Sequence, residues 1–319
     1  MMTVKTTAIQ WRTFVTGMLM GAADLVPGIS GGTVALLSGV YSRLLTAIGH
    51  FDMHLLKLMI GGQLIESWRY IDGRFLLHLG LGIATSLLLL SKLITWLLVV
   101  QPLIMWSLFL GLILVASLLL LRELYSQNQL RWSWLVLGVV VSVVLAKVAF
   151  LQPVDGFSGW GYLWLMAAGA LAISAMILPG VSGSFILLML GIYPFLIARL
   201  AALDLLVISI FALGCGVGLM AFSRLISYLL KQHTAAVMSL LTGLMMGSAV
   251  KLWPWKHTIS YRLNSAGLEI PLQQENLMPW VYSQITGIDD QLVWCLLIAG
   301  FAGLIVAKFG RIQLKDLAV

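Results

Sequence analysis

Two copies of a short polar motif interrupt otherwise apolar stretches of this chain. Residues 27–33 read Pro-Gly-Ile-Ser-Gly-Gly-Thr, and residues 179–185, which follow at an offset of 152, read Pro-Gly-Val-Ser-Gly-Ser-Phe. Such a turn leaves backbone N–H groups unpaired at the start of the next helix, and these groups attract anions, phosphate above all. Glycine lets a ligand approach the backbone, and the hydroxyls add donors. The predicted phosphate-binding residues are Gly28, Ser30, Gly31, Gly32, Thr33, Gly180, Ser182, Gly183 and Ser184.

The alternative interpretation of each motif is a tight turn whose glycines only allow close helix packing. A Walker A loop is excluded, because the Lys-Ser/Thr ending of that motif is missing. Paired Gly/Pro interruptions at corresponding places in two halves of a membrane protein point to a transport site. The duplication therefore favours the transport interpretation over simple packing.

Two cations lie inside apolar segments at equivalent positions. Ser-Lys-Leu-Ile at residues 91–94 matches Ser-Arg-Leu-Ile at residues 223–226, at an offset of 132. A charge within the membrane is costly and is a functional candidate by default, although a long side chain can also extend to the headgroups. We expect Lys92 and Arg224 to face the inside of the bundle and to contact the phosphate.

Asp24 is the only acid inside the first interrupted stretch, and its counterpart at the same offset is Met176. An acid in apolar surroundings suits the coupling of transport to a cation gradient, of H+ or Na+. The alternatives are that Asp24 caps N–H groups at the turn or pairs with an arginine. Asp24 is therefore our coupling candidate.

The composition is that of an integral membrane protein. Hydrophobic residues make up 61% of the 319 residues and charged residues 10%, whereas a soluble domain has about 25% charged residues. The net charge of +7 is scattered between apolar segments, which excludes a nucleic-acid site and suits contacts with membrane lipids. No metal or other cofactor is predicted, because the two cysteines lie in apolar segments and the histidines lack metal-ligand spacing.

Six apolar segments are long enough to span a membrane. They are residues 76–98, 103–121, 132–150, 205–229, 235–252 and 291–308. Regions 11–48 and 161–203 are interrupted at the motif. The first arm, 11–26, would reach about 24 Å as a helix, which is short of a hydrocarbon core of about 30 Å. We interpret each interrupted region as a re-entrant helical hairpin, so the fold class is an all-α polytopic membrane protein.

The repeated motifs divide one transmembrane domain, residues 1–319, into two halves. Repeat 1 covers about 11–125 and repeat 2 about 161–253, and the extra residues of the first half fall near 50–75, a partly amphipathic stretch expected on the cytoplasmic surface. Three spans separate the two hairpins, and this odd number predicts an inverted repeat. An external interfacial loop, 254–290, precedes the last span, 291–308, and no soluble domain is expected.

Basic residues predict the orientation. With the N-terminus inside, twelve lysines and arginines lie in cytoplasmic segments and four in external ones. The sequence therefore predicts a multi-pass protein with both termini in the cytoplasm.

The motifs resemble those of the bacterial polyprenyl-phosphate transporter family. The resemblance rests on Gly-Ala-Ala-Asp-Leu-Val-Pro-Gly-Ile-Ser-Gly-Gly-Thr at residues 21–33 and Ala-Met-Ile-Leu-Pro-Gly-Val-Ser-Gly-Ser at residues 175–184, and it covers most of the chain. It implies translocation of undecaprenyl phosphate across the bacterial cytoplasmic (inner) membrane, which recycles this lipid carrier for cell-envelope synthesis. The second copy departs from the first, with Ser184 for Gly32 and Phe185 for Thr33, so equal roles for the two loops do not follow.

Other functions use some of the same parts. A secondary transporter or channel for a small anion would need a cavity closed to lipid. A lipid phosphatase would need a nucleophile with a general acid or base, and no histidine accompanies the serines of either motif. A scaffold would not need intramembrane cations at matched positions. We therefore expect a transporter of polyprenyl phosphate and not an enzyme, and a homo-oligomer is compatible with these features.

Overall fold

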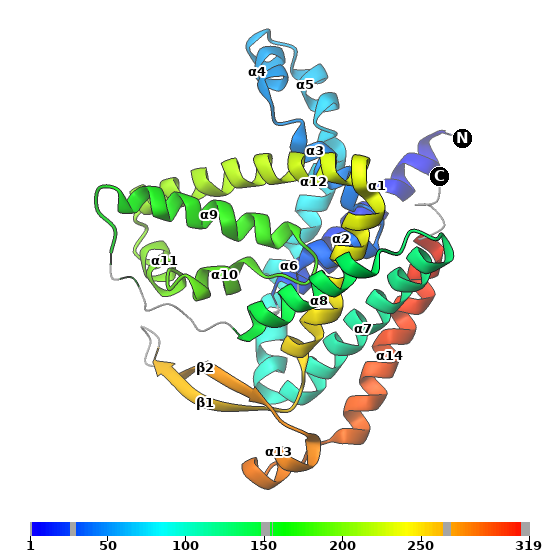
Figure 1. The fold of residues 1–319 in the computed structure, drawn as a ribbon. Coiled ribbons are helices and arrows are strands. Elements are labelled where there is room, and N and C mark those ends of the chain that lie inside the picture. Colours follow the sequence, from blue (N-terminus) through cyan, green and yellow to red (C-terminus); the bar gives the residue numbers. More distant parts are fainter. Residues whose placement is uncertain (1, 26–29, 148–153, 155, 264–268, 314–319) are drawn as a thin grey trace.

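The computed structural model describes residues 2–25, 30–147, 154, 156–263 and 269–313, and most of them are helical (Figure 1). The helices of the first half are α1 (Met2–Asp24), α2 (Gly31–Leu37), α3 (Tyr41–Gly49), α4 (Met53–Ile60), α5 (Leu64–Tyr70), α6 (Gly73–Val100), α7 (Pro102–Ser126) and α8 (Trp132–Lys147). The later elements are α9 (Gly161–Ile177), α10 (Gly183–Met189), α11 (Tyr193–Ala201), α12 (Leu205–Ser248), η1 (Ala249–Leu252), β1 (Lys256–Leu263), β2 (Glu269–Asn276), α13 (Pro279–Thr286) and α14 (Leu292–Gln313).

Long apolar helices dominate the structure, as expected for a helical membrane protein. In the described residues, α6, α7 and the stretch from α12 to Leu252 are long and apolar enough to cross a membrane, and two bent helix pairs bring the number of candidates to five. The apolar parts of α8, α9 and α14 are shorter. Two predicted spans, 205–229 and 235–252, form the single helix α12, which has non-helical backbone angles at His233. Figure 1 shows the two parts of α12 running in different directions on either side of this kink.

The interrupted regions differ in detail from simple hairpins. The first arm is longer than the 16 residues predicted, because α1 extends over 23 residues. In each region the second arm consists of two helices: α2 and α3 meet at a bend of 116°, and α10 and α11 meet at a bend of 112°. Left-handed glycines cause both breaks, with a φ of 73° at Gly39 and 69° at Gly191. Each glycine ends its helix in the same way, because the next N–H, of Val40 or Ile192, bonds back five residues.

Elements and contacts recur between the two halves of the chain. The starts of α2 and α10 share the offset of 152, as do those of α3 and α11. Helix α1 packs along α6, and α9 packs along α12. A side chain on Gly17 would collide with the backbone of Leu79, and a side chain on Gly169 with that of Phe211, which are equivalent positions. The same close helix approach is therefore built twice.

Helices α8 and α14 each pack on a helix far away in the chain. Gly138 of α8 lies against the backbone of Leu240 and Gly243 in the second part of α12, and the N–H of Arg131 donates to the Ser239 hydroxyl at 3.0 Å. Gly111 of α7 lies against the backbone of Ala299 in α14. Small residues permit this approach, as is usual between membrane helices.

The predicted external loop contains regular structure that the sequence analysis missed. Strands β1 and β2 pair antiparallel, with Thr258 opposite Gln274, and α13 follows them. A two-stranded ribbon bounded by aromatic and proline residues carries a weak period-2 signal, so it was not recognised. The extra residues of the first half form α4 and α5, which project from the bundle in Figure 1 and expose apolar side chains such as Ile60 and Ile65.

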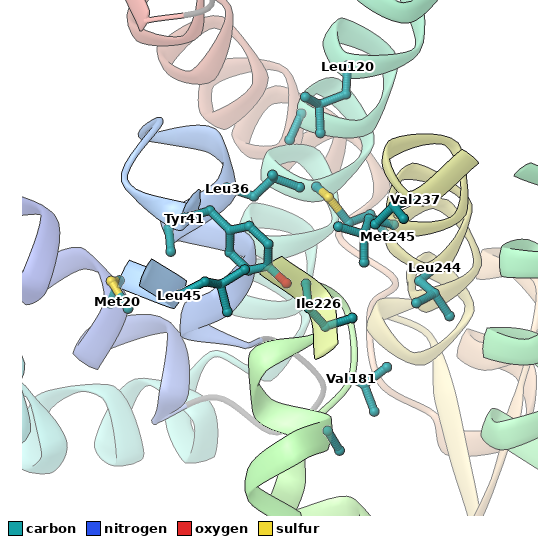
Figure 2. Close-up of a cluster of buried hydrophobic side chains, with 14 of the residues drawn as sticks. Met20, Leu36, Tyr41, Leu45, Leu120, Val181, Ile226, Val237, Leu244 and Met245 are labelled. Atoms are coloured by element: carbon teal, nitrogen blue, oxygen red, sulfur yellow. The ribbon is translucent and has the colours of Figure 1, made fainter. Parts of the chain in front are cut away.

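The hydrophobic core joins both halves behind the two motifs. Figure 2 shows Met20 of α1, Leu36 of α2, Tyr41 of α3 and Val181 of the second motif in one cluster with Leu244 of α12. Because residues from distant segments share this core, the two motif loops are held in a fixed relation to each other.

Candidate functional site

The first motif loop caps the start of α2 with its own side chains. Ser30 has extended backbone angles, and its hydroxyl accepts a hydrogen bond from the N–H of Gly32 at 3.1 Å. The Asp24 carboxylate accepts one from the N–H of Gly31 at 2.6 Å. Of the interpretations open for Asp24, the structure therefore shows the cap, and coupling stays a prediction. Gly28 lies outside the described residues.

The two motif loops are in direct contact. The Ser30 hydroxyl donates to the carbonyl of Met176 at 2.6 Å, and the N–H of Gly180 donates to the Thr33 hydroxyl at 3.0 Å. A Cβ on Gly32 would lie 2.6 Å from the carbonyl oxygen of Ile177. The start of α2 therefore fits against the end of α9 with no room for a side chain at Gly32.

The second motif loop is built differently at the start of α10. Gly180 has a φ of 81°, and a Cβ there would lie 2.9 Å from the Leu244 carbonyl oxygen. The hydroxyls of Ser182 and Ser184 are 2.9 Å apart, and Ser182 forms no side-chain cap to the helix. Gly183 packs against the carbonyl of Ala172 and the side chain of Met176, the residue in the place of Asp24. Within the described part of the chain, no carboxylate caps this helix start.

The structure places both intramembrane cations among exposed residues, and their predicted orientation toward the bundle interior stays a prediction. Lys92 is exposed on α6, beside a shallow hollow of about 450 Å³ that Trp96 also lines. Arg224 is exposed on α12 and donates to the carbonyls of Gly49 at 3.2 Å and Phe51 at 2.7 Å, at the end of α3. Both helices are apolar on nearly every side, so sequence periodicity could not identify their inner faces. Contact of either side chain with phosphate stays a prediction.

Arg224 lies next to a polar surface formed by α3 and the inserted helix α5. A cavity of about 480 Å³ there is lined by Arg43, Arg69 and Tyr70, among other residues. Hydrogen bonds from the Leu55 N–H and the Tyr70 hydroxyl lower the pKa of Asp52 below its ordinary value. Arg69 and Tyr70 belong to α5, in the insertion of the first half, whereas Arg43 belongs to α3.

Two lysines near the second loop, Lys251 and Lys256, were not predicted as site residues, because they are two of the four external basic residues that were counted only for orientation. The Lys251 ammonium lies 3.4 Å from the centre of the Phe185 ring, in the second motif, and the Lys256 ammonium lies 4.0 Å from the centre of the Trp106 ring. Lys256 also donates to the Lys251 carbonyl at 2.5 Å. Burial and the nearby charge of Lys251 lower the pKa of Lys256 to about 8. The sequence signal for this pair was that the two lysines lie on either side of Trp-Pro-Trp at 253–255.

The two loops and the two lysines supply hydrogen-bond donors and positive charge, which are the groups that an anion site uses. In the described residues, no three His, Cys, Asp or Glu side chains come together as metal ligands. The two loops present hydroxyls and N–H groups, and two lysines lie beside the second loop. Groups of these kinds bind phosphate in proteins.

Comparison with known proteins agrees with this chemistry. The profile of the undecaprenyl phosphate translocase-like family matches residues 20–270. A polyprenyl-phosphate transporter of Vibrio cholerae is 41% identical over 288 residues, which cover 90% of this chain and 91% of that protein. A polyprenyl-phosphate transporter of Staphylococcus aureus is 28% identical over 273 residues, covering 77% of this chain and 87% of the relative. No solved structure matches the chain. The chain therefore belongs to the undecaprenyl phosphate translocase-like family.

Proposed function

We propose that this protein translocates undecaprenyl phosphate across the bacterial inner membrane and that the phosphate passes at the junction of the two motif loops. One observation carries the proposal: Ser30 bonds to the end of α9, and Thr33 accepts from Gly180, so the two loops form one polar junction between apolar helices. Two relatives named polyprenyl-phosphate transporters support the substrate. Return of the carrier lipid from the outer leaflet is the use that fits this activity.

The physical task is to replace the water around a phosphate while it crosses a core of about 30 Å. Backbone N–H groups and hydroxyls held on rigid helices can do this without rearranging. The long prenyl tail can stay in the bilayer throughout. No bond has to form or break, so the protein acts as a transporter and not as an enzyme.

The finer architecture that we propose is an inverted repeat. One half comprises α1–α3, α6 and α7 and the other comprises α9–α12, with six spans and two re-entrant regions in all. The shared offsets of helix starts and the equivalent glycine contacts of Gly17 and Gly169 support two equivalent halves. Of the five helices between the interrupted regions, α4 and α5 are short, and α6, α7 and α8 are the proposed spans. An odd number of spans reverses the second half if each of the three crosses the membrane. Both termini then lie in the cytoplasm.

Asp24 is the group that we propose for coupling to a proton or sodium gradient. Its carboxylate occupies the Gly31 N–H, which is one of the donors that a phosphate would use. Binding of a cation or a proton to Asp24 would weaken this bond and release the donor. No cofactor is needed for such a cycle.

The test is translocation by the purified protein in proteoliposomes that contain undecaprenyl phosphate, measured as the access of an external phosphatase to the lipid phosphate. Thr33→Val removes the acceptor for the Gly180 N–H, and we expect it to slow translocation by about tenfold, the equivalent of one good hydrogen bond. Thr46→Val is the matched control, because the Thr46 hydroxyl donates only to Ser42 within α3 in the described structure, and it should behave as the wild type. Uptake of inorganic phosphate without lipid translocation would instead support a small-anion transporter.

A further inference from the structure

We propose that Lys251 and Lys256 form a binding site for a phosphate monoester beside the second motif loop, and that this site receives the headgroup of the lipid. This inference rests on the proposed function and names the residues that hold the substrate at one end of its path. Nothing in the motifs themselves assigns a role to either lysine.

The position of the two ammonium groups is set by elements that are distant in the sequence. Lys251 belongs to η1 and lies over Phe185 of α10, whereas Lys256 begins β1 and lies over Trp106 of α7. The bond from Lys256 to the Lys251 carbonyl joins the two lysines. The β-hairpin, the end of α12, α7 and the second loop therefore converge on one pair of cations.

Among the side chains that the structure describes, no carboxylate pairs with either lysine. In the described part of the chain, the ion pairs join Arg43 to Asp72 and Arg199 to Asp204, and neither involves these lysines. Both lysine side chains are only partly exposed, so water screens their repulsion less than at an open surface. The aromatic rings attract each ammonium but carry no net charge. A bound anion would offset the repulsion between the two ammonium groups, which the rings do not neutralise.

The surroundings select a phosphate monoester on an apolar tail. A phosphate monoester carries a charge of about −1.5 to −2 at neutral pH, which matches two ammonium groups. Phe185 follows Ser184, whose hydroxyl is paired with that of Ser182, so further donors lie next to the Lys251 contact. The Phe185 and Trp106 rings offer apolar flanks on which the first isoprene unit can rest.

A purely structural role explains less of the geometry. Lys256 uses one of its three donors on the Lys251 carbonyl, and a lysine that only extends toward headgroups would not need a ring beneath it. Two such lysines side by side raise the electrostatic cost further. A ligand accounts for the pair, whereas topology alone would be served by lysines placed apart.

The experiment measures binding of farnesyl phosphate to the full-length protein in detergent by isothermal titration calorimetry, with farnesol and inorganic phosphate as parallel probes. Lys251→Gln with Lys256→Gln should weaken farnesyl phosphate binding by at least about tenfold, since two charge-assisted contacts are lost. Lys231→Gln is the matched control, because Lys231 is exposed on α12, and it should bind as the wild type. Lys251→Arg with Lys256→Arg keeps the charge and should recover most of the binding.

The outcomes separate this inference from the proposed function. Unchanged farnesyl phosphate binding by the double glutamine variant, in a wild type that translocates the lipid, overturns the lysine site alone. Equal affinity of the wild type for inorganic phosphate and farnesyl phosphate overturns the lipid headgroup as its ligand. Failure of the wild type to translocate undecaprenyl phosphate overturns the proposed function. Thermal unfolding of each variant shows whether lost binding reflects lost folding, and if the glutamine variant unfolds, the arginine variant decides: wild-type folding with tenfold weaker binding would overturn a site based on charge.

Discussion

The two motif loops share a backbone plan but differ in chemistry. Their return arms bend by 116° and 112°, and their helices α2 and α10 begin at equivalent glycines. The first loop carries its own anion, because Asp24 occupies the Gly31 N–H, and Ser30 caps the helix as well. The second loop has Met176 in place of the acid, and the Ser182 side chain does not cap α10. Lys251 lies against Phe185 of this loop. The first loop is therefore satisfied internally, whereas the second is suited to an external anion.

This difference indicates how a duplicated site can support transport in one direction. Two identical loops would bind phosphate equally, and nothing in them would respond to a gradient. With coupling as we propose it, the carboxylate at the first loop would make access to that loop depend on the state of Asp24, whereas the second loop would depend on the two lysines. Exchanging the distinguishing residues between the loops tests this interpretation.

The largest effect is expected from Gly32→Ser, which gives the first loop the residue of the second. Its side chain would collide with the carbonyls of Ile177 and Met176, and overpacking of this kind costs about 1–3 kcal/mol. We expect translocation to be lost and the thermal midpoint in detergent to fall. The reciprocal Ser184→Gly should stay close to wild type in stability. Wild-type stability of Gly32→Ser would mean that the loops do not interlock as described.

The second prediction concerns coupling through Asp24. Asp24→Asn keeps an acceptor for the Gly31 N–H but cannot take up a proton, so we expect translocation to continue without responding to an imposed pH gradient. The measurement compares proteoliposomes with and without the gradient. A variant that still responds like the wild type would reduce Asp24 to a structural cap.

The third prediction compares the serines that precede the two helices. Ser30→Ala removes the cap on Gly32 and the bond to Met176, so it should cost roughly 2 kcal/mol of stability. Ser182→Ala removes only the contact with Ser184 and should cost less than about 1 kcal/mol, although it should weaken farnesyl phosphate binding. Thermal unfolding and binding titrations measure the two effects. Equal loss of stability in the two variants would contradict the proposed difference between the first loop, whose groups are bonded internally, and the second loop, which is suited to an external anion.

The smallest effects are expected for the matched cations outside the loops. Arg224→Ala removes two bonds to the end of α3 and should cost about 1 kcal/mol, with a severalfold fall in translocation. Lys92→Ala should reduce translocation less, because Lys92 is exposed. Protein levels should stay unchanged in both. Normal translocation by both variants would show that neither side chain contributes to substrate contact.

Much of the helical framework could be predicted from the sequence, because apolar segments in a membrane must pair their backbone groups internally and so form helices. All six predicted spans coincide with helices over their described residues. The Gly-x-Tyr sequence that follows each motif, at residues 39–41 and 191–193, marked equivalent positions. That the helix breaks at Gly39 and Gly191 became clear only from their backbone angles. Helices that are apolar on all sides do not reveal which face is buried, so the sequence could not decide whether Lys92 faces the bundle interior or extends to the headgroups.

The site was predicted in part, for a related reason. Residue types in the motif identified the loops, but the bonds of Ser30 to Met176 and of Gly180 to Thr33 join segments about 150 residues apart. The lysine pair depends on Phe185 lying against Lys251 and on Trp106 lying against Lys256, just after the end of α12. No local pattern encodes such meetings, since they result from how distant helices pack.

The position of α14 has a consequence for how the chain is made. Helix α7 is synthesised early, but its Gly111 groove is filled by Ala299 of the last helix. Until α14 has been made and inserted, this face of α7 must stay covered by lipid or by the insertion machinery. A chain cut short before α14 would leave the groove at Gly111 open. The packing of α7 is therefore complete only once α14 has joined it.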